Sequence, residues 1–239
     1  MLLKIVLIIL LSLAAVVGLA FAYLAHLVNR TPKVKAGGIR VACVGDSITQ
    51  GMGVLFDHVD RNSYPALLQG MLGGEYQVLN FGHSARTLLD SGDHPYRKSH
   101  FFAASLASDP AIVLILLGSN DSKPYNWNAA EYERQLAELV ETYKALPGRP
   151  SVYLMTPPPA FVVKGKKKVA FDIQDDVLRR EIVPIVKRVA ERSRIPTIDL
   201  FAATQEHAEY FPDGVHPNAA GDKVIAQTVY AALKVIPLS

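Results

Sequence analysis

Five residues that could together hydrolyse an ester lie in four separate segments of the sequence, the first three of which follow apolar stretches. They are Ser47, Gly82 and Asn120, with Asp213 and His216 three residues apart near the C-terminus. A serine hydroxyl is a poor nucleophile at neutral pH and needs a base, usually a histidine that a carboxylate orients. Attack on an acyl carbonyl creates an oxyanion, which a glycine N–H, an asparagine amide and the serine's own N–H could stabilise. These residue types predict nucleophilic catalysis on an acyl group.

The turn at Ser47 also has a simpler explanation. Asp46 or Ser47 could cap a helix, because either side chain can accept a hydrogen bond from the helix's first free amides. Each candidate segment is a weak signal alone, and the four segments are Gly45–Ser47, Asn80–Thr87, Leu117–Asp121 and Phe211–Gly221. Their order, each after an expected element, favours catalysis over a set of unrelated turns.

The elements that must position these residues are short apolar runs alternating with helical patterns. The runs predict strands at residues 39–44, 76–81, 111–117, 151–155 and 195–200. The third run is apolar throughout, which is typical of a strand covered on both faces. Amphipathic repeats predict helices over 132–143, 177–189 and 224–233, the second kinked at Pro184. This alternation favours a parallel sheet whose ligands bind beyond the carboxyl ends of the strands.

The four segments resemble the sequence blocks of the SGNH, or GDSL-like, hydrolases, and the resemblance extends from Ile39 to Leu233. It implies an α/β fold, a flavodoxin-like three-layer α/β/α sandwich around a five-stranded parallel sheet, with no metal or cofactor. It also implies a role for each residue. Ser47 is then the nucleophile, His216 the base and Asp213 its orienting partner, and the oxyanion hole consists of Ser47, Gly82 and Asn120.

The residues around the blocks bear on the substrate. Asn62–Gln69, Leu117–Trp127 and Thr156–Pro159 resemble carbohydrate O-acetylesterases of the acetylxylan and sialate types. The resemblance implies a serine esterase that removes acetyl or other short acyl groups from carbohydrate esters. A lysophospholipase or thioesterase, a non-catalytic carbohydrate-binding relative and an acyltransferase remain alternatives. Ala85 departs from the family pattern N-x-G-x-x-G-x-T at its second glycine, which puts the substrate range in doubt.

Two further residues are candidates for substrate binding, Trp127 and Asp46. Trp127 could stack on a sugar ring or anchor the following helix, and the sequence does not decide between these roles. The three histidines His83, His94 and His100 form no recognisable metal-ligand pattern.

Composition and charge limit the possible partners. The net charge of +3 is too small to indicate nucleic acid binding. The basic run Lys164–Lys168 is interpreted as a solvated loop, with an anionic surface as the alternative. The single cysteine, Cys43, excludes an intrachain disulfide and is expected inside a strand.

The N-terminus is almost uninterruptedly apolar from Ile5 to Val28, which is long enough to span a bilayer. We expect an uncleaved transmembrane anchor in residues 1–28, with a cleaved signal peptide and secretion as the alternative. A linker at 29–38 and a hydrolase domain at 39–239 follow. The signal-like start favours a domain facing the periplasm or cell exterior, although the basic residues after the segment favour the cytoplasm.

Overall fold

The computed structural model describes residues 10, 12–19 and 29–235 of the 239-residue chain. The chain divides into two compact units, residues 1–31 and 32–239, and each is described by itself. The predicted anchor or signal segment, Ile5–Val28, lies largely outside the described residues. Within it, residues 12–19 are described and are helical. Among the residues that are described, no helix has the length and hydropathy needed to cross a membrane.

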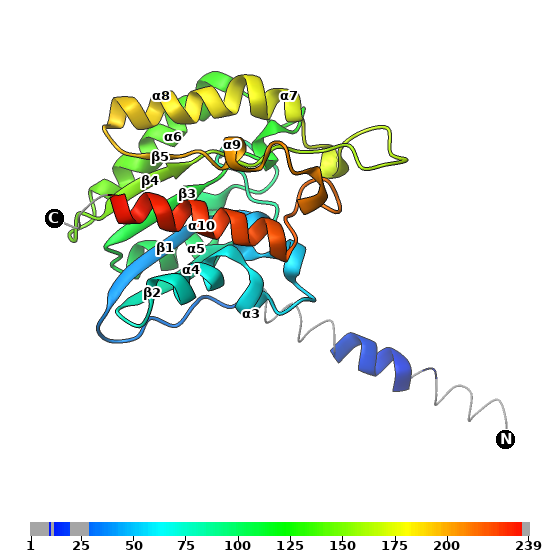
Figure 1. Cartoon of the computed structure of the whole chain (residues 1–239), viewed down its shortest axis with the longest axis horizontal. Coiled ribbons are helices and arrows are strands. Elements are labelled where there is room, and N and C mark those ends of the chain that lie inside the picture. Colours follow the sequence, from blue (N-terminus) through cyan, green and yellow to red (C-terminus); the bar gives the residue numbers. More distant parts are fainter. Residues whose placement is uncertain (1–9, 11, 20–28, 236–239) are drawn as a thin grey trace. The chain divides into compact units, whose positions relative to one another are not determined.

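A five-stranded parallel sheet forms the centre of the second unit, with strand order β2-β1-β3-β4-β5 (Figure 1). The strands are β1 (Ile39–Gly45), β2 (Tyr76–Gly82), β3 (Ile112–Leu116), β4 (Ser151–Met155) and β5 (Thr197–Ile198). This confirms the predicted parallel sheet. The last strand is shorter than the predicted run 195–200, because Asp199 caps the next helix by accepting a hydrogen bond from the Ala202 N–H.

Helices connect the strands and cover both faces of the sheet. The longer ones are α4 (Tyr64–Leu72), α5 (His100–Ala107), α6 (Ala129–Lys144), α8 (Val183–Ser193) and α10 (Ala219–Val235). Short α-helical pieces are α2 (Ser47–Gln50), α3 (Val59–Asn62), α7 (Asp175–Val177) and α9 (Leu200–Thr204). The remaining turns are η1 (Met52–Val54), η2 (Tyr96–Lys98), η3 (Asn120–Ser122), η4 (Ala170–Asp172), the π-helical η5 (Leu178–Ile182) and η6 (Ala208–Tyr210).

Alternate residues of the central strands enter two separate cores, because side chains of a strand point to opposite faces. Val41 and Cys43 of β1 pack with α4 and α10, which lie alongside each other in Figure 1. Ala42 and Val44 pack in the other core, with α5, α6 and α8. Cys43 is fully buried, as expected, and burial raises the pKa of its thiol to about 12.

The predicted helix around Pro184 is confirmed, but it is not α-helical along its whole length. A π-helical turn, η5, precedes α8, and Pro184 lies in the first turn of α8. Proline lacks the N–H that would continue the regular ladder into the previous turn, so the change of helix type occurs where the missing donor costs least.

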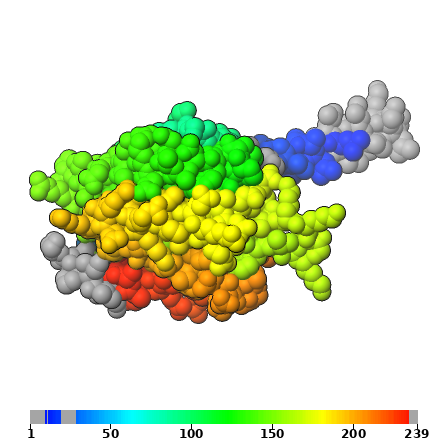
Figure 2. Space-filling view, turned by 90° about the horizontal axis from the view of Figure 1, so that it is seen from above, coloured from blue at the N-terminus to red at the C-terminus, as the bar shows by residue number. Residues whose placement is uncertain are grey.

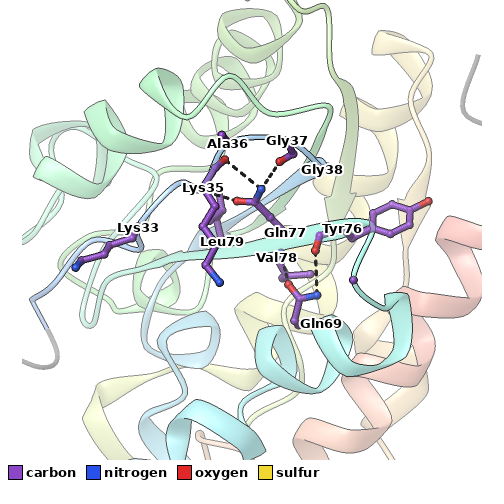
Figure 3. Close-up of a pocket in the computed structure, with 11 residues that line it drawn as sticks. Lys33, Lys35, Ala36, Gly37, Gly38, Gln69, Tyr76, Gln77, Val78 and Leu79 are labelled. Carbon is purple, nitrogen blue, oxygen red and sulfur yellow. Dashed lines mark hydrogen bonds between the residues drawn. The ribbon is translucent and has the colours of Figure 1, made fainter.

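The outer edge of β2 is covered by side-chain amides, at the end of the strand remote from its carboxyl terminus (Figure 3). Gln69 of α4 accepts from the Val78 N–H at 2.8 Å and donates to the Tyr76 carbonyl at 3.0 Å. Gln77 exchanges two hydrogen bonds with the backbone of Lys35 in the linker. A pocket of about 490 Å³ lies among these residues. It borders the first half of β2, whereas Gly82, the candidate oxyanion donor, lies at the other end of this strand.

Candidate active site

Ser47 is presented by an abrupt change from strand to helix. Strand β1 ends at Gly45, Asp46 caps α2 through a 3.0 Å hydrogen bond from the Ile48 N–H, and Ser47 is the first helical residue. A Cβ on Gly45 would lie 2.1 Å from Thr49 Oγ1 and 2.6 Å from the Leu116 carbonyl oxygen. Only glycine allows α2 to begin so close to β3, so the turn places a serine at the carboxyl end of the sheet.

A continuous chain of hydrogen bonds joins Ser47, His216 and Asp213. His216 Nε2 lies 2.9 Å from Ser47 Oγ, and His216 Nδ1 lies 2.7 Å from Asp213 Oδ2. The carboxylate can hold Nδ1 protonated, which leaves Nε2 free to accept the serine proton. Burial alone would raise the pKa of Asp213, but hydrogen bonds from the His216 ring and from backbone N–H groups lower it to about 2. The carboxylate is therefore ionised throughout the neutral range.

The loop that carries His216 is held by backbone contacts. Asp213 Oδ1 accepts from the N–H groups of Val215 and His216 at 2.9 and 2.8 Å, which fixes the turn between acid and base. Gly53 of η1 packs directly on this loop, since a Cβ there would lie 2.0 Å from the Pro217 carbonyl oxygen and 3.2 Å from the His216 carbonyl carbon. The position of the imidazole thus depends on a residue with no side chain.

Gly82 lies beside α2, but its N–H is already engaged. It donates to Asn80 Oδ1 at 2.9 Å, and Asn80 Nδ2 donates in turn to the Thr49 carbonyl at 2.8 Å. A Cβ on Gly82 would lie 2.2 Å from the Gln50 nitrogen, so close approach of β2 to α2 requires glycine here. An oxyanion could receive the Gly82 N–H only by sharing it with Asn80.

Asn120 is buried in η3 after β3, and its amide donates to two neighbours. Nδ2 lies 3.2 Å from the Arg86 carbonyl and 3.4 Å from Asp46 Oδ2. The second contact is long for a hydrogen bond, and catalytic contacts are often loose before substrate binds. A charged oxyanion is a stronger acceptor than the neutral Arg86 carbonyl, and Asp46 holds the amide only at 3.4 Å, so an oxyanion can compete for this amide.

Asp46 is 1% exposed, and substrate contact by this residue stays a prediction. Its two carboxylate oxygens point to the Ile48 N–H and to the Asn120 amide. Burial raises the pKa of Asp46 to about 6, although the bond from Ile48 lowers it. The helix-cap explanation of this residue is the one that the contacts support.

Several residues that support Asn120 were not found from the sequence. Asp121 accepts from the N–H groups of Leu88 and Leu89 at 3.0 and 2.8 Å, which ties η3 to the loop after β2. Asn126 donates to the Asn120 carbonyl at 2.9 Å. The only sequence signal for them was their proximity to Asn120 in the third block, and short polar turns of this kind are common.

A partly buried ion pair extends this support. Asn126 also donates to Asp93 Oδ1 at 3.0 Å, and Lys123 Nζ lies 3.2 Å from Asp93 Oδ2. The Lys123 side chain is 8% exposed and the Asp93 side chain 26%, so the pair is partly shielded from solvent. These contacts connect the loop that follows β2 with the one that follows β3, beside the candidate oxyanion donors.

Trp127 makes the contacts of a helix anchor. Its ring lies 5.4 Å from that of Tyr132 in α6, and its indole N–H donates to Glu181 at 3.0 Å. The ring also packs against the core formed by α5, α6 and α8. Of the two roles that the sequence left open, these contacts favour the anchor, and the stacking of a sugar on Trp127 stays a prediction.

Ala85 adopts the backbone conformation of a glycine, with φ of 62°. The left-handed region costs an L-residue roughly 1–2 kcal/mol. The departure from the family pattern therefore stores strain in the loop next to the candidate oxyanion donors.

In the part of the chain that the structure describes, no group of three or more His, Cys, Asp or Glu side chains is arranged to hold a metal ion. The side chains and backbone of the site supply a nucleophile, a base, an ionised carboxylate and neutral N–H donors. Such a set can transfer an acyl group through the serine.

The chain belongs to the GDSL-like lipase/acylhydrolase family, whose model matches residues 43–224. An acetylxylan esterase of Xylanibacter ruminicola is 39% identical over 222 residues, which cover 85% of this chain and 45% of that protein. The chain therefore spans about half the length of this relative.

Solved structures share the fold. An aryl esterase of M. smegmatis superposes with a TM-score of 0.70 at 19% identity, over 84% of this chain and all of that one. A carbohydrate acetylesterase of Sinorhizobium meliloti gives 0.70 at 20%, over 82% and 99%. A variant of an acetyl-xylooligosaccharide esterase from Geobacillus gives 0.60 at 26%, over 83% and 95%. The three-layer α/β/α arrangement implied by the sequence blocks is thus confirmed.

Proposed function

We propose that this protein is a serine esterase that removes acetyl or other short acyl groups from carbohydrate esters. The observation that carries the proposal is the chain of contacts from Ser47 Oγ through the His216 ring to Asp213, at 2.9 and 2.7 Å. The acetylxylan esterase that is 39% identical supports a carbohydrate ester as substrate.

The reaction follows from these contacts. Ser47 Oγ attacks the acyl carbonyl carbon while its proton passes to His216 Nε2, and Asp213 stabilises the imidazolium that forms. The oxyanion receives the N–H of Ser47 and the Asn120 amide, with Gly82 contributing when its N–H is shared. His216 then protonates the leaving alcohol. A water molecule attacks the acyl-enzyme, again with His216 as base, and releases the acid and the free serine.

The test is hydrolysis of p-nitrophenyl acetate, butyrate, octanoate and palmitate by the wild type and by Ser47→Ala, His216→Ala and the double variant. We expect preference for acetate, and a loss of roughly 10⁴-fold or more in kcat in each single variant. The double variant should lose little more, because members of a catalytic triad act as a unit. Ser151→Ala, an exposed serine at the start of β4, is the matched control and should retain activity.

The outcomes separate the alternatives. Preference for octanoate or longer esters would indicate a lysophospholipase or thioesterase, and clearly additive losses would contradict the roles given to Ser47 and His216. A folded wild type inactive on every ester would indicate a binding protein. Supplying a sugar acceptor and measuring acyl transfer against hydrolysis distinguishes an acyltransferase.

The proposal includes location in the cell envelope, facing away from the cytoplasm. Its support is the apolar stretch from Ile5 to Val28, which has the length of a bilayer span. Fractionation of cells, followed by protease treatment of intact spheroplasts, tests it. Protection of the hydrolase domain from protease would overturn the proposed orientation.

A further inference from the structure

A groove of about 570 Å³ lies on the segment between β4 and α7 and borders Asp213, the carboxylate that orients His216. Its walls come from two parts of the chain, residues 163 and 166–172 in the first and residues 212–213 in the second. The first part lies in the yellow-green segment that projects from the second unit in Figures 1 and 2. The sequence predicted a solvated basic loop here and did not connect it with the site.

Phe171 joins this groove to the base. Its ring centre lies 5.3 Å from that of His216, in an edge-to-face arrangement, and the side chain is 57% exposed. Phe171 and Asp172 both have φ of 58°, a conformation that is unfavourable for residues other than glycine. Lys168 pairs with Asp172 within the same turn. An exposed aromatic ring held in a strained turn against the base offers a flat face to a ligand.

The charges of the groove do not cancel. Asp172 pairs with Lys168, and Asp213 is hydrogen-bonded to the neutral His216 ring, so two carboxylates face three lysines in the lining. Lys166 and Lys167 also line the groove, and neither has a carboxylate partner among the described residues. Their ammonium groups are exposed at its rim. The three lysines outnumber the two carboxylates, so the groove carries a net positive charge.

The position of the base decides which part of a substrate reaches the groove. His216 must donate a proton to the leaving oxygen, so the alcohol portion of the ester lies on the side of the imidazole. Phe171, which lines the groove, packs against that same imidazole, and Asp213, also in the lining, is hydrogen-bonded to it. For a carbohydrate ester the alcohol portion is the sugar, whereas the acyl group extends to the other side of Ser47.

We propose that the groove is a subsite for an acidic sugar, in which the ring of the sugar lies against Phe171 and a carboxylate faces Lys166 and Lys167. The proposal rests on the proposed function and narrows its substrate class to O-acylated glycans that carry carboxylates. The volume of the groove is in the range of a small-molecule site. Its lining combines the lysines with apolar side chains, namely Val163, Val169, Ala170, Phe171 and Pro212.

The experiment compares two acetylated p-nitrophenyl glycosides, a glucuronide and a glucoside acetylated at the same hydroxyls, which differ only in the carboxylate. Acetate release by the full chain gives kcat/KM for each. At low salt the wild type should prefer the glucuronide by about threefold to tenfold, the range expected for two exposed ion pairs. The preference should shrink at about 0.5 M salt, because screening weakens exposed charge pairs.

Variants assign the preference to the groove. The double substitution Lys166→Gln and Lys167→Gln should bring the ratio of the two kcat/KM values close to unity. Lys164→Gln removes one charge from the same loop outside the groove lining and should keep the wild-type ratio. Phe171→Ala should raise KM for both glycosides by a similar factor.

Equal kcat/KM for the two glycosides in the wild type would overturn the subsite, as would an equal fall of the ratio in Lys164→Gln. Failure of the proposed function has a different signature, because the folded wild type would hydrolyse neither the glycosides nor p-nitrophenyl acetate. The two glycosides are then titrated as ligands. Tighter binding of the glucuronide that disappears in the double lysine variant supports the subsite, and equal binding refutes it.

Discussion

Replacing Gly53 with alanine should impair catalysis without altering any side chain of the triad. The added Cβ would lie 2.0 Å from the Pro217 carbonyl oxygen. To reach an ordinary van der Waals distance of about 3.4 Å, η1 and the loop at Pro217 must move apart by about 1.4 Å. The His216 carbonyl carbon, 3.2 Å from the same Cβ, lies on the segment that must move. Since φ of Gly53 is not in the left-handed region, the steric contact is the only obstacle to alanine.

The magnitude follows from the Ser47–His216 contact of 2.9 Å. A displacement of the imidazole by about 1 Å takes this contact outside hydrogen-bond reach and costs up to about 10²-fold in rate. We therefore expect kcat for p-nitrophenyl acetate to fall roughly 10-fold to 100-fold. Overpacking should also lower the free energy of unfolding by about 1–3 kcal/mol.

The assay measures kcat and KM well below the thermal midpoint of each variant, with circular dichroism to confirm folding. The control is Gly70→Ala inside α4, where no atom lies within 4 Å of the added methyl group. Alanine favours a helix over glycine by about 0.8–1 kcal/mol, so this control should be more stable and equally active. A folded Gly53→Ala protein with kcat within about twofold of wild type would refute the argument that η1 positions the base.

Three other substitutions have defined outcomes. Ala85→Gly relieves a φ of 62° and should raise the free energy of unfolding by about 0.5–1 kcal/mol, measured by urea denaturation; a decrease would contradict the strain. Asn120→Ala should lower kcat by about 10²-fold with a smaller change in KM, and a loss below fivefold would argue against an oxyanion donor. Burial raises the pKa of Asp222 to about 8, although the hydrogen bond from the Tyr64 N–H lowers it. The folded state therefore retains a proton on Asp222 that the unfolded state loses above about pH 4. The free energy of unfolding of the wild type should fall as pH rises from about 4 to 8. The difference in this free energy, Asp222→Asn minus wild type, should increase between pH 5 and pH 9, and a pH-independent difference would contradict this.

The order and type of the strands could be predicted because they depend on local apolar runs. The runs at β1, β2, β3 and β4 were located to within a residue or two. Burial on both faces leaves no polar residue in β3, whereas the edge strand β2 is only partly buried. The run at 195–200 was overestimated, because the capping preference of Asp199 prevailed over the apolar character of Leu200. Apolarity alone does not indicate where a strand gives way to a helix.

The candidate site, too, contains residues that could be predicted from the sequence and features that could not. Ser47, Asp213 and His216 could be proposed from residue type and from their position after predicted elements. The burial of Asp46 and the strained turn at Phe171 could not, because neither depends on a periodic pattern. Both result from how irregular loops, distant in sequence, pack against the carboxyl ends of the strands.

The amide side chain of Gln69 has a consequence for how the protein behaves in concentrated solution. It occupies the Val78 N–H and the Tyr76 carbonyl, which would otherwise be open on the outer edge of β2. An open edge is a template on which a strand of another molecule can add, and natural proteins cover such edges. Gln77 holds the linker at Lys35 against the start of the same strand.

A recombinant protein shortened to begin at Ile39 would lose that linker and keep only Gln69 over the edge. We expect such a chain to self-associate more readily than one that retains residues from Lys33 onward. Where the expression boundary is placed would then decide whether the enzyme stays monodisperse at the concentrations used for crystals.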